Sequence, residues 1–135
     1  SVVVSNIPGG GIPIYVRLFT RFNTGWQSTD YIYTAAANTQ AAITNPVPSG
    51  TPPYPTLPGT SVTFTWNTGS GALEYWLDIG TGGAGSANVS TGSRGLSTSV
   101  VVSNIPGGGI PIYVRLYTRF NTGWQYRDYT YTAAP

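Results

Sequence analysis

The chain has 135 residues but only six arginines and four carboxylates, so that 7 % of it is charged and the net charge is +2. Histidine, cysteine, methionine and lysine are absent, which removes imidazole bases, thiolate nucleophiles and nitrogen or sulfur metal ligands. We therefore expect no enzyme activity, no cofactor and no metal site. Scattered arginines also disfavour nucleic acid binding, and the apolar runs are far too short for membrane insertion.

Residues 1–37 and 99–135 are near copies of one another, 98 positions apart, and match at 32 of 37 positions. The five differences are Phe19/Tyr117, Ser28/Tyr126, Thr29/Arg127, Ile32/Thr130 and Ala37/Pro135. This period is too long for a solenoid repeat but close to the size of a sandwich domain, which predicts an array of separate modules. We expect residues 1–37 to be the C-terminal strands of a partial module, cut from a longer protein.

The segment between the two copies is rich in proline, and six of the eleven prolines lie between residues 46 and 58. Proline favours extended backbone, so residues 38–58 are expected to form a semi-rigid linker. Alternatively, they supply the first edge strand of the complete module, because proline is tolerated at sheet edges. We place the boundary near Ser49 and the complete module at residues 59–135.

The complete module reads as a series of strands. No segment has a helical period, whereas apolar and polar residues alternate between glycine-rich turns. Residues 61–67 and 73–80 each have the pattern of a strand with one buried face. Two further strands are predicted at residues 96–104 and 110–120. The chain is therefore expected to be all-β.

The last predicted strand, residues 124–133, follows a three-residue hairpin loop at residues 121–123 and should pair back antiparallel. Strict alternation would bury Asp128 beside Trp124, so we expect a β-bulge near Arg127 and Asp128 that turns the later tyrosines inward. Five aromatic side chains are assigned to the core: Phe64, Trp66, Tyr75, Phe120 and Trp124.

Six or seven short strands at this spacing predict a two-sheet antiparallel β-sandwich. The segments SVTFTWN, YWLDIGT and IYVRLYTRFNTGWQYRDYTYTA resemble an immunoglobulin-like, fibronectin type III-like repeat of large secreted or surface proteins of bacteria. The resemblance covers most of the complete module and residues 1–37, and it implies an extracellular scaffold. Because members of that class have many functions, it assigns no catalytic residue.

One face of the module carries a patterned set of side chains. Six residues that point away from the predicted core match in spacing across two strands: Glu74, Trp76, Asp78, Arg115, Tyr117 and Arg119. A single antiparallel register pairs position 74 with 119, 76 with 117 and 78 with 115, which places two ion pairs around an aromatic pair. Such cross-strand pairs contribute roughly 0.2–1 kcal/mol each, so the simplest interpretation is a ladder that fixes sheet register.

The alternative interpretation is a binding patch. Trp76, Tyr113 and Tyr117, flanked by arginines, would dock another copy of the module or stack on a sugar ring. A glycosidase is disfavoured, because Glu74 and Asp78 lie about 13 Å apart along one strand, beyond the roughly 5–9.5 Å that a catalytic carboxyl pair needs.

Two remaining features bear on function. Asn88 begins an Asn-Val-Ser triplet, which makes it a candidate glycosylation site. The partial copy leaves its apolar face without a covering sheet, which another chain would cover by strand addition or exchange. We expect a non-enzymatic structural module of a bacterial extracellular filament, stalk or surface protein that forms homo-oligomers or polymers. The alternative is a carbohydrate-binding or adhesive module of a secreted protein.

Overall fold

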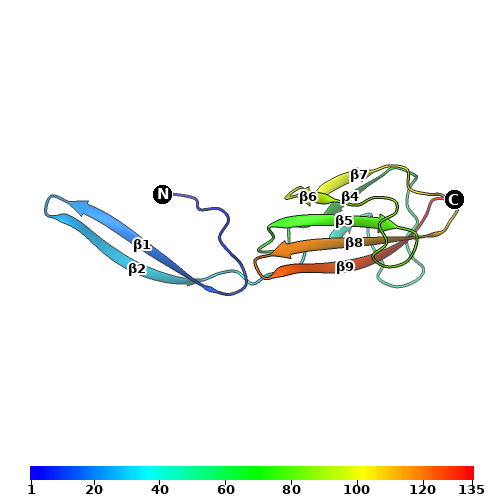
Figure 1. Ribbon diagram of the computed structural model, residues 1–135. Coiled ribbons are helices and arrows are strands. Elements are labelled where there is room, and N and C mark those ends of the chain that lie inside the picture. Colours follow the sequence, from blue (N-terminus) through cyan, green and yellow to red (C-terminus); the bar gives the residue numbers. More distant parts are fainter.

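The computed structural model describes residues 1–135, and all of its regular elements are β-strands. In chain order the strands are β1 (Pro13–Phe22), β2 (Gly25–Thr34), β3 (Ile43–Asn45), β4 (Val62–Trp66), β5 (Glu74–Gly80), β6 (Ser93–Gly95), β7 (Ser99–Val102), β8 (Pro111–Phe120) and β9 (Gly123–Thr132). They form antiparallel sheets in the orders β1-β2, β3-β4-β7 and β6-β5-β8-β9 (Figure 1). No helix in the chain is long and apolar enough to cross a membrane.

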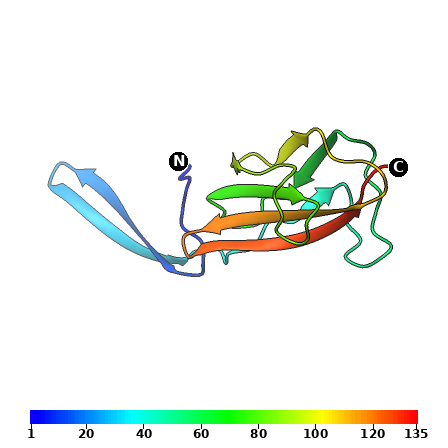
Figure 2. The ribbon, with the colours of Figure 1, turned by 45° about the vertical axis from the view of Figure 1, so that its right-hand side comes forward.

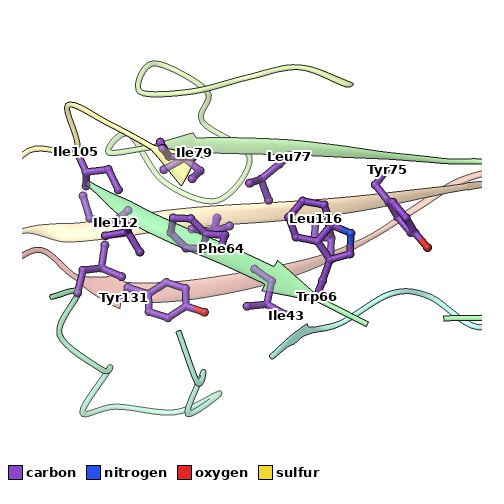
Figure 3. Packing of buried hydrophobic residues seen from close by; sticks show 14 of the residues in the cluster. Ile43, Phe64, Trp66, Tyr75, Leu77, Ile79, Ile105, Ile112, Leu116 and Tyr131 are labelled. Atoms are coloured by element: carbon purple, nitrogen blue, oxygen red, sulfur yellow. The ribbon is translucent and has the colours of Figure 1, made fainter. Parts of the chain in front are cut away.

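The three-stranded and four-stranded sheets enclose one core, and together they form the body of the molecule (Figure 3). Alternation along β4 buries Val62, Phe64 and Trp66, whose side chains pack against the inner face of the larger sheet. Phe64 packs edge-on against Tyr131 with ring centroids 5.9 Å apart, and Trp66 packs in the same way against Tyr75 at 5.9 Å. The all-β, sandwich-like arrangement predicted from the sequence is confirmed.

The proline-rich segment belongs to this body, which differs from the linker expected at residues 38–58. Its strand β3 pairs with β4, and Ala41, Ile43 and Leu57 are almost fully buried in the core. The module therefore begins before residue 43 and not near Ser49. Proline does not prevent this, because β3 is an edge strand of three residues and Pro46 follows it directly.

The β1-β2 hairpin extends from the body as a separate arm, in both views of the chain (Figures 1 and 2). Its ten paired positions have the same register as the β8-β9 hairpin, 98 residues later. Almost every residue of the arm is exposed to solvent, whereas alternate residues of β8 are fully buried. The same local sequence thus makes the same hairpin, but only the second hairpin has a sheet packed against it.

The start of the chain shows the same dependence on partners. Residues 1–4 and 99–102 are both Ser-Val-Val-Val. The second copy forms β7 by pairing with β4, while the first forms no strand and leaves Val3 95 % exposed. Residues 1–37 therefore contain two strands, where the second copy of the sequence has three, because no equivalent of β4 is present to pair with residues 1–4.

Strand β9 runs without the expected bulge. Its register with β8 is continuous from Gly123 to Thr132, and the hairpin loop has two residues, because Gly123 already pairs with Phe120 and has a φ of +121°. The expected bulge depended on the assignment of Trp124 to the core, and that assignment is wrong. Trp124 and Asp128 instead share the solvent-facing side of the sheet, so plain alternation places Tyr131 in the core.

Candidate functional site: the outer face of the four-stranded sheet

The strands β5, β8 and β9 place one set of polar and aromatic side chains on the face opposite the core. Glu74 pairs with Arg119, Trp76 with Tyr117, and Asp78 with Arg115, which confirms the predicted register. The neighbours in between on β5, Tyr75, Leu77 and Ile79, are buried. Burial of these three residues fixes which face the others must occupy.

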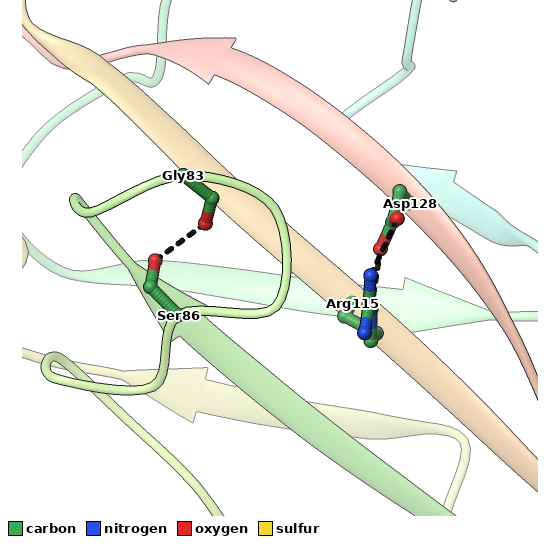
Figure 4. A network of polar contacts seen from close by, with 4 residues as sticks. All are labelled: Gly83, Ser86, Arg115 and Asp128. Atoms are coloured by element: carbon green, nitrogen blue, oxygen red, sulfur yellow. Dashed lines mark hydrogen bonds and ion pairs between the residues drawn. The ribbon is translucent and has the colours of Figure 1, made fainter.

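Only one of the two predicted ion pairs forms. Arg119 Nη2 lies 3.5 Å from Glu74 Oε1. Arg115 turns away from Asp78 and binds Asp128 on β9, with Nε and Nη2 donating to the two carboxylate oxygens at 2.7 and 2.8 Å (Figure 4). Asp128 is also a direct cross-strand neighbour of Arg115 and offers both oxygens to the guanidinium fork.

Arg115 is held on three sides. Its guanidinium lies 3.8 Å from the centroid of the Tyr126 ring. On a second side it donates hydrogen bonds to Asp128, which raise the pKa of the guanidinium above its usual value. The loop between β5 and β6 passes over it, and a side chain at Gly85 would meet Arg115 Nη1 at 2.8 Å. Ser86 fixes this loop by donating to the Gly83 carbonyl at 2.7 Å (Figure 4).

Asp78 is the most buried charged residue of the face, with 8 % of its surface exposed. Its Oδ1 atom accepts two hydrogen bonds, from Trp76 Nε1 at 2.8 Å and from Thr91 Oγ1 at 2.6 Å. The carboxylate therefore fixes the orientation of the Trp76 indole and ties β5 to the segment before β6. Its other oxygen, Oδ2, makes no hydrogen bond within the chain.

The aromatic side chains on this face come from three adjacent strands; Trp76 and Tyr117 are half-buried, and Trp124 and Tyr126 are exposed. Tyr117 meets Trp124 edge-on, with centroids 6.2 Å apart and planes at 87°, and it meets Tyr126 at 5.7 Å and 60°. Arg119 lies 5.8 Å from the Trp124 ring. Sequence reasoning missed Trp124 and Tyr126, although they lie four and two residues before Asp128, which places all three on one face of a regular strand.

A shallow groove of about 430 Å³ runs between these side chains, and its lining consists of Trp76, Asp78, Tyr117 and Trp124. Tyr113, which was assigned to the patch, does not line the groove. It pairs with Gly80 and Thr130, two residues along β8 from Arg115.

The β1-β2 arm repeats half of this arrangement. Arg17 binds Asp30 through both oxygens, and Phe19 meets Trp26 edge-on at 6.4 Å and 88°. The Arg17 guanidinium lowers the pKa of Asp30 by hydrogen bonding. Nothing in the arm corresponds to Trp76 or Asp78, because no third strand lies beside β1, so the arm has no equivalent groove.

Other predicted features lie apart from the groove. Asn88 is exposed in the β5-β6 loop, where its side chain accepts from the Thr81 amide and donates to Thr81 Oγ1, both at 3.0 Å. No group of three or more histidine, cysteine, aspartate or glutamate side chains is placed to hold a metal ion. Comparison with known proteins finds no family model and no curated protein that matches the chain.

Proposed function

We propose that the chain is a non-enzymatic structural module of an extracellular filament, stalk or surface protein of bacteria, of the immunoglobulin-like, fibronectin type III-like kind, and that its copies self-associate through β-sheet contacts or strand exchange. The observation that carries this proposal is the arm, which has the inner face of a sandwich sheet but no sheet opposite it. Residues 1–37 are then the end of one module and the body is the next.

The inner face of the arm differs from that of the β8-β9 hairpin at one position, where Thr29 corresponds to Arg127. Six side chains are common to both, in the arm as Ile14, Val16, Leu18, Phe22, Tyr31 and Tyr33. Leu18 is 58 % exposed and its counterpart Leu116 is fully buried. Full burial of a large apolar side chain contributes about 1.5–3 kcal/mol. A partner that covered this face would therefore stabilise the assembly by a comparable amount for each side chain that it buried fully.

The size of the face limits what can cover it. Two paired strands of ten residues measure about 33 by 10 Å at roughly 3.3 Å per residue and 4.8 Å per strand. Two arms packed face to face would bury of the order of 700 Å², less than the roughly 1,200 Å² of a stable interface. An arm therefore needs a wider partner than another arm, and the body of a second copy is wide enough.

The strand edges favour sheet addition as the contact. β9 is the outermost strand of its sheet and is bonded on its outer side only near Thr132, to the backbone of Pro55 and Leu57. β1 and β2 also have one free edge each. Joining the arm of one chain to the β9 edge of the next would satisfy both edges and extend the sheet head to tail.

Strand exchange is the second route, since the two hairpins are nearly identical. An arm that replaced the β8-β9 hairpin of a neighbour would bury its own apolar face and expose the one that it displaced. The number of uncovered hairpins would remain the same, so exchange alone gives no net burial. Sheet addition displaces no hairpin and leaves the inner face of the arm available to pack against the neighbouring body, and we therefore place it first.

Light scattering on the full chain, together with electron microscopy of the native particle, tests the proposal. We expect particles much heavier than the 14.3 kDa chain. Leu18→Ser should shift the particle mass toward 14.3 kDa, because it places a polar side chain in the apolar face of the arm and changes no residue in the core of the body. The matched control is Ile32→Thr, which gives the arm the residue that the second copy has on its outer face, and it should leave the mass unchanged.

Two results would contradict the proposal. One is a wild-type chain that stays at 14.3 kDa at high concentration. The other is an assembly that Leu18→Ser leaves intact, because the inner face of the arm would then play no part in it.

A further inference from the structure

We propose that the groove on the outer face of the four-stranded sheet, formed by Trp76, Asp78, Tyr117 and Trp124, is a binding site for a neutral saccharide. This inference is independent of the assembly function, because the groove lies on the body and the uncovered apolar face lies on the arm. Three features of the groove support a saccharide: its shape, an unused hydrogen-bond acceptor in its wall, and the balance of charge around the groove.

The shape is that of an open corner with aromatic walls. Tyr117 and Trp124 stand at 87° to one another, and Trp76 lies across from Tyr117 on β5. Small-molecule sites typically have roughly 300–1,000 Å³ of space and mostly apolar walls with a few fixed polar groups. At about 430 Å³ the groove falls within this range, and it is shallow and open to solvent.

The polar group in the wall is Asp78. Its residue is 8 % exposed, and Oδ1 already holds the Trp76 indole and the Thr91 hydroxyl. Oδ2 has no partner within the chain and is not sealed from solvent. A buried carboxylate seeks donors for all of its lone pairs. Oδ2 is therefore a fixed acceptor that a hydroxyl donor in the groove can satisfy.

The charges around the groove select a neutral ligand. The guanidinium groups of Arg119 and Arg115 lie 5.8 Å and 5.9 Å from the Trp124 and Tyr117 rings, so both rings already have a cation beside them within the chain. Each arginine has its own carboxylate, Glu74 or Asp128, so no free cation remains to hold an anion. A sugar offers hydroxyl donors together with C–H faces that pack on aromatic rings, and it carries no charge.

The two copies of the repeat differ at the border of this groove. Position 117 is Tyr where the arm has Phe19, and position 126 is Tyr where the arm has Ser28. In each hairpin these two positions are direct cross-strand partners. The hairpin beside the groove thus has one more ring, that of Tyr126, and one more hydroxyl group, that of Tyr117, than the arm, and these provide stacking surface and hydrogen-bonding capacity.

Isothermal titration calorimetry on the full chain tests the inference. The ligands are soluble oligosaccharides of glucose, mannose, galactose, xylose and N-acetylglucosamine, each up to about 10 mM, a range suited to millimolar sites. At least one series should bind. Trp124→Ala should weaken that binding about tenfold or more, as expected when an anchor side chain at the centre of a site is removed. Asp78→Asn should also weaken it while the groove keeps its shape.

The arm provides the matched control. Trp26 has the same cross-strand neighbours as Trp124 and a similar edge-on contact with Phe19, but it lies outside any groove. Trp26→Ala should leave saccharide affinity unchanged. Circular dichroism of each variant checks that the body is folded, and light scattering separates an effect on the groove from an effect on assembly.

Four outcomes would overturn the inference. In the first, no saccharide of the panel binds. In the second, Trp26→Ala and Trp124→Ala weaken binding equally. In the third, Trp124→Ala changes particle mass and no sugar affinity, which would make the groove a contact between chains. Stronger binding of free arginine or tetramethylammonium than of any sugar would likewise refute it, because the groove would then be selective for cations.

Discussion

The two leucines at positions 18 and 116 provide a direct measure of what the sheet opposite a hairpin contributes. They have the same place in the two hairpins, whose sequences differ beside them only at Phe19/Tyr117 and at the cross-strand partner, Thr29 or Arg127. Leu116 is fully buried, and Leu18 is 58 % exposed. We predict that Leu116→Ala lowers the free energy of unfolding of the body by about 2–5 kcal/mol, whereas Leu18→Ala changes it by less than about 0.5 kcal/mol.

Urea denaturation, followed by circular dichroism at a concentration where the chain is monomeric, makes the comparison. With a slope of about 2 kcal/mol per molar urea, the middle of the usual range, Leu116→Ala should lower the midpoint by about 1–2.5 M. The midpoint of Leu18→Ala should stay close to that of the wild type. Equal losses for the two variants would refute the reasoning, since they would show that the arm is packed against the body in solution.

Three further predictions concern single groups. Burial raises the pKa of Tyr131, so its neutral form stabilises the fold below pH ~10, and this stability is lost as pH rises through the higher folded pKa. Absorbance and circular dichroism should therefore show the ionisation of Tyr131 only together with alkaline unfolding. Ionisation of Tyr131 in the folded state would contradict this. Amide hydrogen exchange should be slow in residues 99–102 and fast in residues 1–4, because only the former pair with another strand; equal rates would disprove it. Asp128→Asn should lower the free energy of unfolding by about 1 kcal/mol, because it disrupts a bidentate ion pair with a largely covered arginine. Asp30→Asn, which disrupts the exposed pair in the arm, should have no measurable effect. A similar loss of stability in both variants would show that burial of the arginine does not strengthen the pair.

The binding proposal and the assembly proposal use different parts of the chain, so each can fail without the other. Leu18→Ser tests the arm and leaves the groove intact. Trp124→Ala tests the groove and leaves the inner face of the arm intact. A chain that assembles and binds sugar would have the two properties of an adhesive surface array. A chain that only assembles would be a plain structural module.

The sequence predicted the sheet register well because alternation is a local signal. Two strands with buried residues at every second position can pair in few ways, and matching Glu74, Trp76 and Asp78 to the charges and ring on β8 selected one of them. The ion pairs were harder to predict. Arg115 has an acidic neighbour on each side, and only the three-dimensional position of β9 shows that it binds Asp128.

The error at Trp124 has a similar cause. Tryptophan is usually taken for a core residue, and that assumption required a bulge to keep Asp128 out of the core. The continuous register of β9 shows that both side chains face solvent, and this placed Trp124 in the groove with Trp76 and Tyr117. Composition alone cannot separate a buried ring from one in a surface site, because both are apolar.

By itself, the sequence determined that the chain is all-β, that it contains the same hairpin twice, and which residues of the first strand of each hairpin share a face. Only the tertiary structure decided which face of β9 is buried, that residues 38–58 belong to the body, and which of two identical Ser-Val-Val-Val segments becomes a strand. The physical reason is that turns and alternation depend on neighbours along the chain. Burial and strand pairing depend on partners far away in sequence, here β4 and β5, which the second hairpin has and the first lacks.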